Sequence, residues 1–227
     1  MTSSRLATDS LKTPSRRQMF IGASMLAFTL LGESPAPAQR RRHYAPRGRM
    51  SAADLKAALR KLWEDHITYT RNFIISALAG LPDQGAVTNR LLRNQDDLGD
   101  AIKPFYGNAA GARLTALLRD HILIAADVVT AAKAGNQGQL TANQRRWSDN
   151  GRDLASFLSG ANPYLPQARV ATMLQRHLDL TTGEVVGRLG NDWGADIRSY
   201  DQGHEHMLMF SDVLADAIVR QFPNRFA

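Results

Sequence analysis

A six-residue pattern occurs three times in this chain, at residues 62–67 (LWEDHI), 117–122 (LLRDHI) and 173–178 (MLQRHL). Each copy has two apolar residues, two polar or charged residues, a histidine and a further apolar residue. The histidines are His66, His121 and His177, which are 55 and 56 residues apart. The pattern predicts three equivalent helices, each with a histidine at the same position.

Each of these histidines lies on the apolar face of its predicted helix, because residues three and four positions apart share a face. The faces contain Leu59, Leu62, Trp63, Phe73 and Ile74 around His66, Leu114, Leu117, Leu118 and Val128 around His121, and Val170, Met173, Leu174 and Leu180 around His177. We therefore expect the three imidazoles to point into the core of the fold.

The rest of the chain also favours helices, since no segment shows sustained alternation of apolar and polar residues. The prediction is a single all-α domain over residues 51–227, an up-and-down helical bundle with short broken connecting helices. Asn94 is expected to cap a new helix, and so is Thr181 or Thr182. The predicted helices run over about 52–79, 84–93, 95–105, 109–134, 140–159, 166–178 and 192–221, with a short additional helix that contains Glu184 and ends at 190–191.

The predicted connections are short, so neighbouring helices should be antiparallel. The three histidine-bearing helices would then point in the same direction. Their imidazoles are expected at a similar height around one core.

The N-terminal segment is typical of a secretory signal. Arg16 and Arg17 precede an apolar run over 19–31, and residues 36–38 (APA) form a small-x-small cleavage site. The Arg pair favours the twin-arginine class, so the predicted partner is the twin-arginine export machinery and the predicted location is periplasmic or otherwise exported. Residues 1–38 would be removed, and residues 39–50 (QRRRHYAPRGRM) are a predicted basic disordered linker. The apolar run is shorter than the about 20 residues that a spanning helix needs. We also expect no transmembrane segment in the mature chain.

Charge and composition narrow the possible functions. The net charge is +7, but residues 51–227 contain equal numbers of basic and acidic side chains. Nucleic acid is therefore not a predicted partner. The chain has no cysteine, so any metal would be held by histidine, carboxylate or methionine.

The three core histidines are candidate ligands for a divalent metal ion or a small cofactor. Asp201 and His204 of the last helix are expected to face the same interior, whereas His206 is expected to face water. The complete set of predicted metal ligands is His66, His121, His177, His204, Glu64, Asp201 and Glu184. The alternative is a non-catalytic binding or interaction module with purely structural histidines. The sequence contains neither a nucleophile elbow nor a phosphate-binding loop that would indicate an enzyme, and no reaction is predicted.

Several short stretches resemble a family of uncharacterised bacterial helical proteins over about residues 58–226. They are LWE (62–64) with His66 and Arg71, RLLRN (90–94) with Asp97, PFYG (104–107), NPY (162–164), HLDLT (177–181), SDV (211–213) and QFP (221–223). The resemblance implies one helical domain and no established activity. Some members carry the label acetylglutamate kinase or glycosyltransferase, but such a kinase needs an α/β nucleotide fold that this helical pattern does not support. His204 and His206 lie outside the shared pattern.

Overall fold

The computed structural model describes residues 50–227, so the predicted signal peptide (1–38) and all but the last residue of the predicted linker lie outside the described residues. The described part is helical, without strands, which confirms the all-α prediction. Its elements are α1 (Ala52–Ala79), α2 (Gln84–Lys133), α3 (Gln137–Ala161), α4 (Gln167–Leu189), α5 (Trp193–Gln221) and the 3₁₀ helix η1 (Pro223–Arg225).

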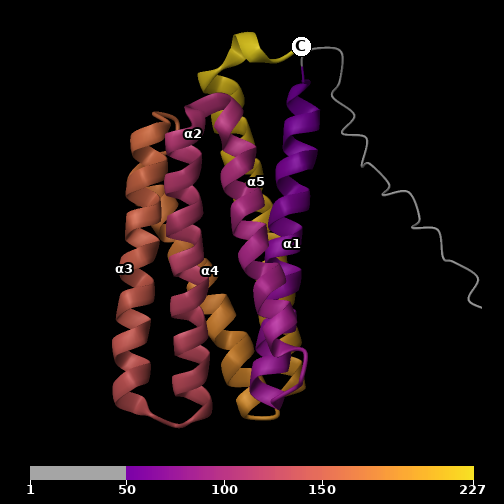
Figure 1. The fold of residues 1–227 in the computed structure, drawn as a ribbon, viewed down its shortest axis with the longest axis vertical. Helices are drawn as coiled ribbons and strands as arrows, with labels where there is room; N and C mark the ends of the chain where they lie inside the picture. Colours follow the sequence, from indigo (N-terminus) through magenta and orange to yellow (C-terminus); the bar gives the residue numbers. More distant parts are fainter. Residues whose placement is uncertain (1–49) are drawn as a thin grey trace, which may run out of the picture. The chain divides into compact units, whose positions relative to one another are not determined.

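A sharp bend divides α2 into two antiparallel limbs. Gly107 has φ 84° and ψ 169°, a conformation that other residues rarely adopt, and it follows Pro104 by one turn. The first limb (84–106) returns alongside α1, and the second limb (108–133) reverses direction again (Figure 1). The bundle therefore has six crossings, and α1, the second limb of α2, and α4 point the same way (Figure 1).

The two limbs of α2 approach closely at a pair of glycines. A Cβ atom on Gly99 would lie 2.7 Å from the carbonyl oxygen of Gly111, and a Cβ on Gly111 would lie 2.7 Å from that of Gly99. Neither position has room for a side chain. The glycines therefore set the distance between the limbs just below the bend.

Two predicted helix breaks are wrong. Asn94 lies inside α2, fully buried, and its Nδ2 donates to the carbonyl oxygen of Leu62 at 2.9 Å instead of capping a helix. Thr181 and Thr182 lie inside α4, and Thr181 Oγ1 donates to the carbonyl oxygen of His177 at 2.9 Å. Asn and Thr favour caps in isolation, but these side chains find partners within the bundle.

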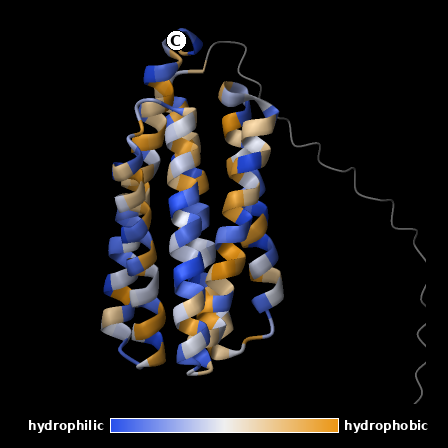
Figure 2. Cartoon of the chain, turned by 90° about the vertical axis from the view of Figure 1, so that its left-hand side faces the viewer, coloured by the Kyte–Doolittle hydropathy of each residue, from blue (hydrophilic) through white to orange (hydrophobic). Residues whose placement is uncertain are grey.

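Apolar residues form stripes along the helices, separated by polar residues (Figure 2). Along α1, His66 lies between Trp63, which belongs to the largest apolar cluster, and Phe73, which belongs to a second cluster. His66 thus lies near the level at which the first apolar cluster gives way to the second. Within residues 50–227, no helix combines the length and the apolar character needed to cross a membrane.

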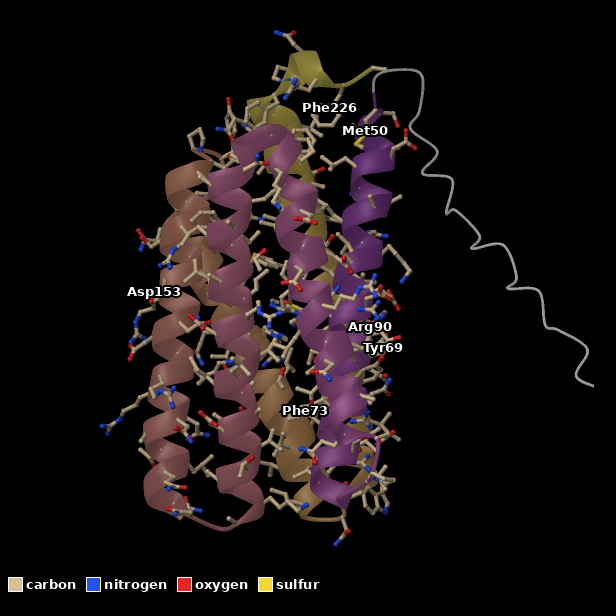
Figure 3. All side chains as sticks on the ribbon, in the orientation of Figure 1. Met50, Tyr69, Phe73, Arg90, Asp153 and Phe226 are labelled. Atoms are coloured by element: carbon tan, nitrogen blue, oxygen red, sulfur yellow. The ribbon has the colours of Figure 1, made fainter. Side chains whose placement is uncertain are left out.

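The two ends of the described chain meet at one end of the bundle. The backbone N–H of Ala227 donates to the carbonyl oxygen of Met50 at 3.2 Å. Figure 3 shows Met50 and the neighbouring Phe226 at this end. Because an even number of antiparallel helical segments runs along the bundle, the described chain begins and ends at the same end of it.

The glycine contact in α2 gives a first prediction. Gly99→Ala should lower the free energy of unfolding by about 1–3 kcal/mol, because the added Cβ overlaps the backbone of the facing limb. Urea denaturation measures the change. The matched control is Gly160→Ala in α3, where a Cβ meets no atom within 4 Å and the change should be neutral or slightly stabilising. Equal effects of the two substitutions would contradict the close approach.

Candidate functional site

The three repeated histidines meet in the core. The ring centroid of His177 lies 5.6 Å from that of His66 and 6.0 Å from that of His121. All three side chains are buried, with 2–3% of their surface exposed. We call these three residues the histidine layer. Three helices that point the same way bring the three copies of the sequence pattern to one level.

His121 has hydrogen-bond partners on both ring nitrogens. The indole Nε1–H of Trp147 donates to His121 Nε2 at 3.1 Å, and His121 Nδ1 lies 2.7 Å from Asn150 Oδ1. Because an indole N–H can only donate, Nε2 is the acceptor and the proton is on Nδ1. Asn150 Oδ1 then accepts this proton, and its Nδ2 donates to the carbonyl oxygen of Leu117 at 3.0 Å. His121 therefore has no free lone pair for a metal.

His66 has a weaker contact with the returning helix. Its Nδ1 lies 3.4 Å from Nε2 of Gln95, which also donates to the carbonyl oxygen of Leu91 at 2.8 Å. Gln95 is fully buried, and its Oε1 has no partner. An edge-to-face contact with Trp63, at 5.4 Å between ring centroids, fixes the other side of the imidazole.

The three helical hairpins repeat one further hydrogen bond. In each, a side chain on the returning rod donates to the backbone carbonyl four residues before the histidine. The bonds are Asn94 Nδ2 to Leu62 O (2.9 Å), Asn150 Nδ2 to Leu117 O (3.0 Å) and His206 Nε2 to Met173 O (2.8 Å). The sequence repeat therefore extends to the returning rods, although the donor changes from an amide to an imidazole in the third hairpin.

His206 is the exception in this repeat, and the prediction that it faces water is wrong. It is partly buried, and its Nε2–H is taken up by the carbonyl oxygen of Met173. An imidazole has no carbonyl oxygen to offer, unlike the amide of Asn150. Nδ1 of the neighbouring His177 is buried and has no hydrogen-bond partner. The equal spacing of 29 residues from His121 to Asn150 and from His177 to His206 was a signal in the sequence that could have identified this position.

Burial keeps the histidine layer uncharged. Loss of solvation lowers the pKa of His66 to about 3, and the neighbouring His121 lowers it further. Burial lowers the pKa of His121 to about 4, and burial together with the other histidines lowers the pKa of His177 well below its ordinary value. All three imidazoles are neutral at pH 7.

Glu184, a predicted metal ligand, belongs to a buried ion-pair network instead. Arg71 donates to Glu184 Oε2 at 3.1 Å and forms a two-pronged pair with Asp196, which also accepts from Arg188 at 3.0 Å. Burial raises the pKa of Glu184 to about 7, opposed by its hydrogen bond from Arg71. Its carboxylate is thus directed to a guanidinium.

The remaining predicted ligands lie outside the core. His204 Nε2 is 2.8 Å from Glu64 Oε1 where α1 meets α5, and both side chains are partly exposed. Asp201 is exposed, because the polar face of α5 includes it. The structure thus brings together His66, His121 and His177, and separates the other four predicted ligands from them. Over residues 50–227, no three His, Asp or Glu side chains are arranged as a group that could hold a metal ion.

Comparisons with known proteins found no matching family model, no matching curated protein and no matching solved structure. The site is therefore interpreted from its own geometry.

The lowered histidine pKa values predict a loss of stability in mild acid. Below pH 6.5 the unfolded chain binds protons on three histidines that the folded chain leaves neutral, so the free energy of unfolding falls as pH falls towards 4. Glu184 acts in the opposite direction, because its pKa is raised from 4.5 to about 7 and the folded chain binds that proton more readily. The net effect of about two protons corresponds to roughly 3 kcal/mol per pH unit at most. Urea denaturation at a series of pH values from 7.5 to 4.5 measures it, and a constant stability over this range would contradict the buried, neutral layer.

The irregular third hairpin predicts that two reciprocal substitutions have opposite signs. His206→Asn should raise the free energy of unfolding by about 1 kcal/mol, because an amide can donate to Met173 O and accept from Nδ1 of His177. Asn150→His should lower it by about 1–3 kcal/mol, because Nδ1 of His121 loses its acceptor. Thermal or urea denaturation compares both with the parent chain. Destabilisation by both would show that the hairpins are not equivalent.

Proposed function

We propose that this chain is an exported, non-catalytic binding domain whose core histidines are structural. The observation that carries the proposal is the state of His121, which is buried, neutral and hydrogen-bonded on both ring nitrogens. A metal would have to displace Trp147 or Asn150 from it. Buried polar groups that are fully hydrogen-bonded are typical of structural positions.

The remaining histidines also support a structural role. Only three or four converging ligands make an ordinary zinc site. Because both ring nitrogens of His121 are hydrogen-bonded, only His66 and His177 of the histidine layer remain as possible metal ligands. His66 lies beside Gln95. The carboxylate of Glu184 accepts a hydrogen bond from Arg71, so it could join a ligand set only by giving up this buried contact.

Access to the layer argues for binding rather than reaction. The three imidazoles are 2–3% exposed and uncharged at pH 7, so they are neither within reach of a substrate nor poised as acids. A binding role at the surface of the bundle does not require the histidines to be exposed or charged. The exported location is proposed from Arg16, Arg17 and the apolar run that follows them.

Metal analysis of protein recovered from the exported fraction tests the proposal. We expect a chain that begins at residue 39 by mass spectrometry and contains no stoichiometric metal. His66→Ala, His121→Ala and His177→Ala should each lower the free energy of unfolding by about 2–4 kcal/mol through lost packing, and for His121 also through lost hydrogen bonds. The matched control is His204→Ala, a partly exposed histidine whose loss should cost less than about 1 kcal/mol.

Two results would overturn the structural interpretation. One is a molar equivalent of metal that disappears in the His66, His121 and His177 variants but stays in the His204 variant. The other is full stability of the three core variants, because removing a buried side chain leaves a cavity in the core.

A further inference from the structure

An enclosed apolar space lies beside the histidine layer, towards the α2–α3 turn. It has a volume of about 60 Å³ and lies between α1, α2, α3 and α4. We call it the lower cavity. Its walls include Phe73, Ile74, Val128, Val129, Trp147 and Val185. Figure 3 labels Phe73 in this half of the bundle.

The lower cavity adjoins a groove on the surface. The groove has a volume of about 280 Å³ and lies between α3 and α4. Gln144, Trp147 and Thr182 line both spaces and therefore form the boundary between them. In Figure 1, α3 and α4 diverge towards this end of the bundle. The residues that line the inner space are thus mainly apolar, and those that line the outer groove are more polar.

The two spaces differ in their polar groups. In the lower cavity, the hydroxyl oxygen of Thr70 is buried and has no hydrogen-bond partner. The groove is lined by Ser148, Gln175 and the carboxylate of Asp179, and by no basic side chain. Gln175 Nε2 donates to Asp179 Oδ1 at 2.8 Å, which holds the carboxylate in place. The field in the groove favours a positive charge over a negative one.

We infer that the lower cavity and the groove together bind a small amphiphilic amine. Its apolar body occupies the lower cavity, and its protonated amine lies in the groove beside Asp179. The inference deepens the proposed function, since it names the class of ligand for the proposed binding domain.

The volume of the lower cavity limits the apolar body. A water molecule needs about 10–15 Å³ of such volume, so the cavity has room for roughly four or five heavy atoms. A short alkyl chain meets this limit, whereas a long fatty chain does not. n-Butylamine is therefore the probe with the best match of length and charge.

The indole N–H signals of the three tryptophans report where a probe binds. Trp147 lines the lower cavity and the groove, Trp63 lines a separate apolar cavity of about 50 Å³, and Trp193 is exposed. In NMR titrations of the purified protein, n-butylamine should shift the Trp147 signal and leave the other two unchanged. n-Butanol should shift the same signal with weaker affinity, and butyrate should have no effect at the same concentration.

Asp179→Asn tests the charge without disturbing the core, because Asp179 is exposed. It should weaken n-butylamine binding by about two- to five-fold and leave n-butanol binding unchanged. The matched control is Asp153→Asn, an exposed aspartate of α3 that does not line this groove and that should have no effect (Figure 3).

No shift of the Trp147 signal up to high millimolar n-butylamine would overturn the inference, and so would a shift of Trp63 alone or equal binding of butyrate. These outcomes are independent of the metal analysis. If the protein contains no metal and does not bind n-butylamine, the inferred ligand class is wrong but the structural role of the histidines stands. If the histidine layer contains metal, the proposed function itself is wrong.

Discussion

A buried imidazole is stabilised when its nitrogens find hydrogen-bond partners, and this constraint organises the bundle. In the second hairpin, Trp147 and Asn150 both approach His121 from the returning helix. They can do so only when α3 lies beside the second limb of α2 in one register. Asn94 and His206 occupy the corresponding places in the other two hairpins. A polar residue 28 or 29 positions after each histidine therefore aligns each pair of helices, while the apolar stripes supply most of the free energy of folding.

The sequence alone predicted the fold class and the meeting of the three histidines, for a definite reason. Each histidine was on an apolar stripe, and the number of crossings between copies was even, so the copies arrived at one level. The fate of Asn94 and Thr181 was not predictable in this way. Both residues favour caps locally, but Asn94 donates to a carbonyl of α1 and Thr181 donates to the carbonyl four residues before it in α4. His206 was missed because its partner, the carbonyl oxygen of Met173, lies on another helix.

The candidate site was harder to predict than the fold. The sequence predicted Glu184 as a metal ligand, and the structure shows that its side chain is buried. The sequence could not reveal that Arg71 reaches across from α1 and engages both Glu184 and Asp196. Likewise, the sequence pattern predicts that His204 faces the core, whereas the structure pairs it with Glu64 near the surface. The partners of long side chains depend on which groups the fold brings close, and the sequence does not show this directly. A carboxylate that forms such an ion pair is not available to bind a metal.

The hydrogen bond between Ala227 and Met50 has a consequence for the order of the helices along the chain. Since these two residues already touch, a short linker could join them without moving any helix. New termini could then be opened in the exposed turn at Gly135 and Asn136, where the chain crosses from α2 to α3. Such a circularly permuted chain would keep every hairpin contact around the histidine layer. The arrangement of the helices thus depends on how they pack, and the chain ends could lie at another turn without changing that arrangement.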